Sequence, residues 1–175
     1  VVGPEGTVRT GGSFAATTLE ADEETFMSTG RLSLSGQSDA QVVNLGKIAA
    51  SGGNIVLAAR HVRNDGAISA SGQGALVAAT EVVISDTSAD ASILVRTGPS
   101  GDAVNSGAIE AAVVRLEAAG GNVYALAGNT EGVIRAAKAE REGGRVVLRA
   151  AGRVEINARI EAAGGAGGDG GVVVA

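Results

Sequence analysis

The 175-residue chain contains no cysteine and no tryptophan, and its aromatic residues, Phe14, Phe26 and Tyr124, amount to 2% of the sequence. The lack of cysteine excludes disulfides and thiolate metal sites. The scarcity of large rings argues against a thick globular interior and favours a thin core of small and β-branched side chains between closely packed sheets. Only two prolines are present, and together with the frequent glycine turns they predict many short strands.

Basic blocks and long apolar runs are also missing. The net charge is −5 with no cluster of lysine and arginine, which excludes a nucleic-acid binder that works by electrostatic attraction. No apolar run reaches about 18 residues, so no membrane-spanning helix is predicted. The chain starts at Val1 with no signal peptide, and we therefore expect a mature or truncated piece of a longer protein.

Glycine is abundant, at 28 residues, and much of it falls at the boundaries of a repeated phrase. The three copies are VVNLGKIAASGGNIVLAA (42–59), HVRNDGAISASGQGALVAA (61–79) and AVNSGAIEAAVVRLEAAGGNVYALA (103–127). Asn44 and Asn64 are 64 − 44 = 20 residues apart. A strand–turn unit of this size cannot bury its own apolar face, so it must stack on copies of itself. The repeats therefore predict an all-β solenoid, a parallel β-helix with about 20 residues per coil.

No linker divides the chain, which predicts one domain over residues 1–175 with about eight coils. We expect residues 1–40 to form irregular first coils and residues 41–175 to form regular coils, interrupted by a polar insert at 85–103. VIRAAKAEREGG (133–144) has helix-favouring residues but lies between repeat strands, so a loop or one helical turn is expected. The side chains expected to point inward are Ile55, Leu57, Ile68, Leu76, Ile109, Leu116, Leu126 and Leu148.

The Asn-x-Gly triplets are the most regular polar feature. Asparagine tolerates left-handed backbone and glycine supplies a second positive φ, so these residues are expected to be structural turn positions. In a solenoid, equivalent asparagines can also stack and share amide hydrogen bonds. A ligand bound by a row of amides is the alternative. The turn positions are Asn44, Gly46, Asn64, Gly66, Asn105 and Gly107.

Acidic residues raise the question of a metal or polysaccharide-cleaving site. Such sites need carboxylates at equivalent positions on successive coils, whereas these acids fall in predicted loops, where solvated side chains are expected. Scattered arginines, among them Arg115, Arg145 and Arg149, are interpreted as a mixed-charge surface that keeps a rod soluble. The acids in question are Asp22, Glu23, Glu24, Asp86, Asp90 and Asp102.

Two further motifs give no site. His61 is the single histidine, and without cysteine it cannot make a zinc centre, so it is expected to be a surface strand residue. GGAGGDGGV (164–172) is close to the nonapeptide calcium repeat, but Gly171 occupies the position that requires a large apolar residue, and the motif occurs once. No G-x-S-x-G motif is present. We therefore predict no catalytic residue, no cofactor and no metal.

The repeats resemble those of the filamentous-haemagglutinin-like exoproteins of two-partner secretion, in the region called the haemagglutination-activity or secretion domain. The resemblance rests on residues 1–19, 42–70, 104–111 and 120–127. It implies a right-handed parallel β-helix, export, and recognition by a partner outer-membrane transporter. Family members carry an Asn-Pro-Asn-Gly motif that this chain lacks, so the chain is expected to begin just downstream of it.

These observations predict a non-catalytic β-helical shaft or secretion module of a large adhesin-like exoprotein, secreted or at the surface of a Gram-negative-type bacterium. One alternative is a self-assembling extracellular fibre subunit or binding module. A second alternative is a polysaccharide-active β-helix enzyme. The apolar segments at 1–2 and 172–175 would leave uncapped strand edges, which predicts salt-resistant end-to-end self-association.

Overall fold

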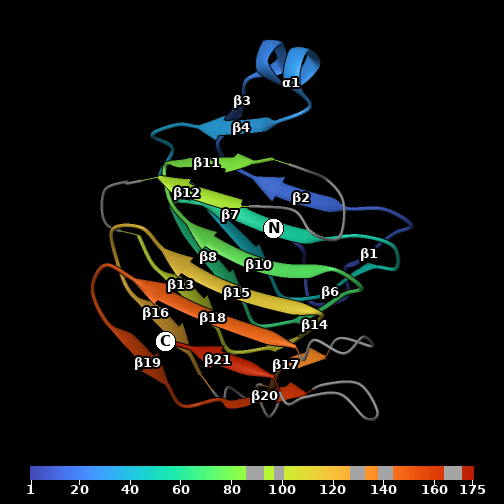
Figure 1. Ribbon diagram of the computed structural model, residues 1–175, viewed down its shortest axis with the longest axis vertical. Coiled ribbons are helices and arrows are strands. Elements are labelled where there is room, and N and C mark those ends of the chain that lie inside the picture. Colours follow the sequence, from blue (N-terminus) through green and yellow to red (C-terminus); the bar gives the residue numbers. More distant parts are fainter. Residues whose placement is uncertain (86–92, 97–100, 127–132, 138–143, 164–170) are drawn as a thin grey trace.

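The computed structural model describes residues 1–85, 93–96, 101–126, 133–137, 144–163 and 171–175. Among these residues the chain forms 21 strands and one short helix. Most strands belong to three parallel sheets, which we call A, B and C and which the chain visits in turn (Figure 1). The prediction of an all-β fold with parallel strands is therefore confirmed.

The strands of each parallel sheet follow one another in space across the stack. Sheet A contains β19 (Val154–Ile156), β16 (Val123–Ala125), β13 (Ala103–Asn105), β8 (His61–Asn64) and β5 (Gln41–Asn44). Sheet B contains β1 (Thr7–Thr10), β6 (Lys47–Ala50), β9 (Ala67–Ala70), β14 (Ala108–Ala111), β17 (Val133–Ala137) and β20 (Arg159–Ala163). Sheet C contains β2 (Phe14–Thr17), β7 (Ile55–Ala59), β10 (Gln73–Ala78), β15 (Val113–Ala118), β18 (Arg145–Ala150) and β21 (Val172–Val174).

One passage of the chain through sheets A, B and C, which we call a round, adds one parallel strand to each sheet. Sheets B and C have six strands each, so the described chain makes six rounds where about eight coils were expected. The expected spacing of 20 residues separates Asn44 from Asn64, but 41 residues separate Asn64 from Asn105. The longer step contains two strands that leave the stack, and this is why fewer rounds fit.

The core lies between the three sheets and is built from columns of like side chains. In sheet B, Ile48, Ile68, Ile109 and Ile134 occupy successive register positions and are buried. A second column, in sheet C, consists of Leu57, Leu76, Leu116 and Leu148. Each fully buried side chain of this size contributes about 1.5–3 kcal/mol, so each of the four rounds that supply these columns adds several kcal/mol of apolar burial. Flat aliphatic columns of this kind need no aromatic residues, which fits the composition.

The inward prediction was wrong for one residue. Ile55 and the other predicted inward residues are buried, but Leu126 is half-buried. In β16 the inward positions are taken by Val123 and Ala125, both fully buried. Because side chains alternate across a strand, Leu126 falls one residue beyond an inward position.

A fourth sheet, sheet D, lies against the outer face of sheet C (Figure 1). It is antiparallel, and its order is β12 (Ile93–Arg96), β11 (Glu81–Ile84), β4 (Leu32–Ser35) and β3 (Glu20–Ala21). A second apolar cluster joins the two sheets, with Leu34 and Val82 from sheet D meeting Val56 and Val77 from sheet C. As a result β7 and β10 are buried on both faces.

Sheet D corrects two expected boundaries. Residues 1–40 are not uniformly irregular, because β1 and β2 pair in register with β6 and β7, while residues 20–35 leave the stack. The polar insert expected at 85–103 leaves the stack earlier, at Glu81, because Val82 and Ile84 are buried beneath sheet D instead of in the main core.

Two local assignments also differ from expectation. The segment 133–144 was expected as a loop or helical turn, but residues 133–137 form β17, and residues 138–143 lie outside the described part. Burial of Ile134 in the isoleucine column outweighs local helix propensity. The short helix α1 (Glu23–Thr29) was not predicted. Within the described residues, no helix has the length and apolar character needed to cross a membrane.

Candidate functional site

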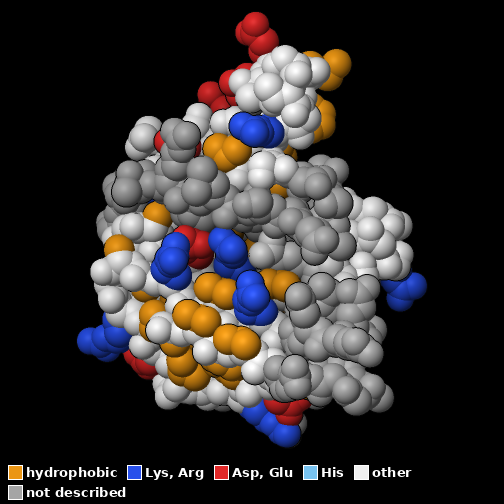
Figure 2. All heavy atoms as spheres, in the orientation of Figure 1, with side chains coloured by type: hydrophobic (Ala, Val, Ile, Leu, Met, Phe, Trp, Pro, Cys, Tyr) orange, Lys and Arg blue, Asp and Glu red, His pale blue; other side chains and the backbone are white. Residues whose placement is uncertain are grey.

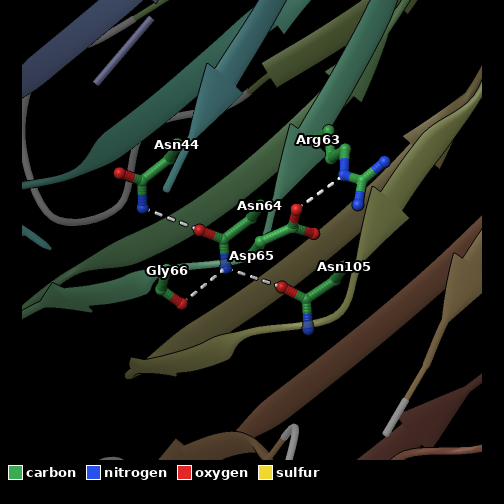
Figure 3. Close-up of polar contacts among 6 residues, drawn as sticks. All are labelled: Asn44, Arg63, Asn64, Asp65, Gly66 and Asn105. Carbon is green, nitrogen blue, oxygen red and sulfur yellow. Dashed lines mark hydrogen bonds and ion pairs between the residues drawn. The ribbon is translucent and has the colours of Figure 1, made fainter. Parts of the chain in front are cut away.

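Three asparagines are the last residues of neighbouring strands of sheet A and lie next to one another on successive rounds (Figure 3). They are Asn44 of β5, Asn64 of β8 and Asn105 of β13. Asn44 donates from Nδ2 to Oδ1 of Asn64 at 2.7 Å, and Asn64 donates from Nδ2 to Oδ1 of Asn105 at 2.7 Å. Nδ2 of Asn105 donates to the carbonyl oxygen of Gly107 at 2.9 Å. All three side chains are fully buried. This asparagine ladder uses both ends of each amide inside the protein, leaving little capacity to bind a ligand.

Gly46, Gly66 and Gly107 lie two residues after the ladder asparagines and stack on successive rounds. They were expected to supply a positive φ, but the structure gives another reason for glycine there. Among the described glycines, the one with left-handed φ is Gly30, so Gly46, Gly66 and Gly107 need no positive φ. A Cβ at Gly66 would lie 2.1 Å from the carbonyl oxygen of Gly46, and a Cβ at Gly107 would lie 2.0 Å from that of Gly66. Glycine is required at these turns because successive backbones approach too closely for any side chain.

A second polar ladder begins at Asp102, where a solvated loop residue was expected. Oδ1 of Asp102 accepts hydrogen bonds from the backbone N–H of Asn122 at 2.8 Å and from its Nδ2 at 3.1 Å. Oδ1 of Asn122 in turn accepts from the backbone N–H of Arg153 at 2.9 Å. Asp102 and Asn122 are 20 residues apart, which matches the repeat spacing. The match went unrecognised because one residue is an acid and the other an amide. Asp102 therefore positions a turn through these hydrogen bonds.

The acidic cluster at 22–24 caps a helix. Asp22 is the N-cap of α1, and its Oδ1 accepts from the backbone N–H of Thr25 at 2.9 Å while Oδ2 accepts from the Thr25 hydroxyl at 2.6 Å. These hydrogen bonds hold the pKa of Asp22 below its ordinary value. Glu23 and Glu24 lie in the first helical turn, where negative charge is favourable, and Gly30 ends the helix in the left-handed conformation.

The other residues singled out in the sequence do not converge. His61 is half-buried at the start of β8. Asp86, Asp90 and the segment 164–170 lie outside the described residues. Among the described residues, no group of three or more histidine, cysteine, aspartate or glutamate side chains could hold a metal ion.

The outer face of sheet C over β15, β18 and β21 carries the most distinctive exposed chemistry. Figure 2 shows basic side chains around an acidic one, beside a row of apolar side chains. Register places these residues side by side, with Val113 next to Arg145 and Arg115 next to Val147. Glu117 is buried between two arginines, 3.2 Å from Nη1 of Arg115 and 3.9 Å from Nη1 of Arg149. We call this surface the open face, and its outward residues are Val113, Arg115, Glu117, Arg145, Val147, Arg149, Val172 and Val174.

From the sequence, these arginines were expected to be scattered surface charge. Their clustering follows from register: Arg115 lies diagonally from both Arg145 and Arg149, and Glu117 lies directly opposite Arg149. Positions 115 and 149 are 34 residues apart in a chain of unequal round lengths, so a 20-residue period could not bring them together.

Comparison with solved structures finds a likeness over most of the chain. The chain is similar in structure to the HMW1 secretion domain from Haemophilus influenzae, with a TM-score of 0.76 and 26% sequence identity. The likeness covers 93% of this chain and 44% of that one, so the chain spans less than half of the solved domain. No family model matches the sequence, and no curated protein gives a significant match. Among known proteins, this fold is thus similar to that of a secretion domain.

Proposed function

We propose that this chain is the β-helical secretion module and shaft of a larger, non-catalytic, adhesin-like exported protein. In this proposal, residues 1–175 form one domain, a right-handed parallel β-helix whose rounds follow from sheet A to sheet B to sheet C. The handedness is supported by the general rule that crossovers between parallel strands are right-handed in about 98% of cases. The observation that carries the function is the structural likeness to the HMW1 secretion domain over 93% of the chain.

The stacked rounds supply a physical mechanism for export. Each of the four middle rounds buries one isoleucine and one leucine of the two columns, such as Ile68 and Leu76, which is worth about 3–6 kcal/mol before the entropy of ordering is subtracted. A chain that leaves a transporter unfolded could add one round after another outside the cell. Each completed round would resist return of the chain, because retreat would expose its column residues again.

The proposed partner is an outer-membrane transporter of the two-partner secretion type, and the proposed location is the medium or the surface of a Gram-negative-type cell. Support comes from the repeat resemblance and from the structural likeness to a secretion domain. The absence of cysteine from all 175 residues is compatible with passage of an unfolded chain through the periplasm.

Export can be tested with the gene for an outer-membrane transporter from the same locus. The full product of the natural gene is produced in a Gram-negative host with and without that transporter, and its amount in the medium is measured. We expect transporter-dependent release. Equal release without the transporter, or none with it, would contradict the proposal. Asn157→Ala, an exposed change in a turn, serves as a control that should be released like the natural chain.

A further inference from the structure

Helix α1 stands at one end of the molecule, beyond sheet D (Figure 1). Within the described part of the chain none of its side chains is buried, and Phe26 and Met27 are 42% and 83% exposed. Large apolar side chains at this exposure are unusual on a chain with only two phenylalanines and one methionine. Acidic residues lie beside them, and the group, which we call the acidic knob, consists of Glu20, Asp22, Glu23, Glu24, Phe26, Met27 and Arg31. Four acids less one arginine leave the knob a charge of −3.

The open face has the opposite character. Three arginines less Glu117 give it a charge of +2 on a chain whose net charge is −5. Arg149 is 76% exposed at its side chain, and Arg145 is also exposed. Val172 and Val174, at 52% and 51% exposure, extend an apolar row between the arginines. Arg115 donates a hydrogen bond to buried Glu117 at 3.2 Å, which holds its guanidinium group on the sheet, and Arg149 lies 3.9 Å from the same carboxylate.

We infer that the acidic knob of one copy docks on the open face of a second copy. The two surfaces are complementary in charge and in apolar character. The exposed acids of the knob would meet the exposed arginines of the face, and Phe26 and Met27 would meet its valines. The knob is narrow and protrudes, while the face is a sheet surface broad enough to receive it (Figures 1 and 2). The occupant is therefore another copy of this chain, because the complementary surface is present on the chain itself.

This contact is heterologous, since the knob and the face are different surfaces. Each copy keeps one free knob or one free face after pairing, so association produces rings or open chains instead of closed two-fold dimers. The charges make the contact weaken as salt screens them. End-to-end pairing of strand edges, predicted from the sequence, would resist salt, so the two forms of association can be distinguished.

The test uses two charge-reversed variants of the full chain. Arg145→Glu with Arg149→Glu reverses the face, and Glu23→Arg with Glu24→Arg reverses the knob; all four side chains are exposed. Because Arg149 lies opposite buried Glu117 and the two glutamates lie in the first turn of α1, circular dichroism checks that each variant is folded, and Arg145→Glu alone, which leaves the contact of Arg149 with Glu117 in place, is measured beside the double variant. The control Arg9→Glu with Lys47→Glu makes the same charge change as the face variant at exposed positions of sheet B. Association is measured by sedimentation velocity over a hundredfold concentration range, in about 0.02 M and about 0.5 M sodium chloride.

We expect the natural chain and the control to associate with a dissociation constant of roughly 10 μM at low salt, and each variant alone to bind at least about tenfold more weakly. Mixing the two variants should restore association, because each then meets a surface of opposite charge. A natural chain that stays monomeric at low salt, association unaffected by either reversal, or failure of the mixture to associate would each overturn the inference.

Discussion

Removal of Asn64 from the middle of the asparagine ladder is the most direct test of what holds the rounds in register. In Asn64→Ala, Oδ1 of Asn105 loses its donor, and Nδ2 of Asn44 keeps a carbonyl contact with Ala67 at 3.4 Å. A buried polar group without its partner costs about 1–3 kcal/mol. One group is left without its partner and a second keeps only a long contact, so we expect a loss of about 3 kcal/mol in the free energy of unfolding. Asn105→Ala should cost less, about 1–2 kcal/mol, because Nδ2 of Asn64 can still reach the carbonyl oxygen of Gly66 at 3.3 Å.

The assay is urea unfolding followed by circular dichroism of the β-sheet signal. With a slope of about 2 kcal/mol per molar urea, a loss of about 3 kcal/mol moves the midpoint by about 1.5 M. Asn157→Ala is the control, because Asn157 is exposed and donates to Glu155 at the surface, so its replacement should cost less than about 0.5 kcal/mol. If Asn64→Ala lowered the midpoint no more than Asn157→Ala does, the ladder would not contribute to stability and the reasoning would be refuted.

Three further predictions concern backbone approach, core charge and pH. Gly66→Ala should cost at least about 3 kcal/mol, because its Cβ would lie 2.1 Å from a backbone oxygen, whereas Gly12→Ala, with no atom within 4 Å, should unfold like the natural chain in the same urea assay. Leu57→Asp should prevent cooperative folding, because an unpaired charge would be buried; a soluble, cooperatively unfolding variant would contradict this. Because Thr25 lowers the pKa of Asp22 in the folded chain, its support of α1 should be complete above the unfolded-state pKa and lost as pH falls through the folded value; NMR titration of the Asp22 carboxyl should show a midpoint below that of an ordinary aspartate.

The sequence predicted the parts of the fold that depend on local repetition. Ile48 and Ile68 stack in register, as their 20-residue spacing indicates, and the leucine column follows the same logic. The position of the Asn-x-Gly turns could also be predicted, but the physical role of their glycines could not. A sequence shows that a residue lacks a side chain, while the 2.1 Å approach of one round to the next is a property of the assembled stack.

The parts that were missed depend on contacts across unequal distances in the chain. Nothing in a 20-residue period pairs Leu34 with Val82, or brings Arg149 to Glu117. Helix α1 is a different case, because its signals were local: Asp22 as N-cap, acids in the first turn and Gly30 at the end. Those signals were interpreted as a solvated acidic cluster, since seven residues between strands fall below the length at which helical periodicity is evident.

Sheet D imposes an order on the folding of the stack. Strand β4 emerges early in the chain but finds its partner β11 only after two more rounds have been built, since Leu34 pairs with Val82. Until then Leu34 of β4 and Val56 of β7 lack the contribution of Val82 to the cluster that buries them. Sheet D therefore connects the first three rounds only after β11 has formed, and these rounds should fold and unfold as one cooperative unit. Among the described residues, the later rounds have no such connecting sheet, so under a pulling force they should unfold one at a time before the first three rounds unfold together.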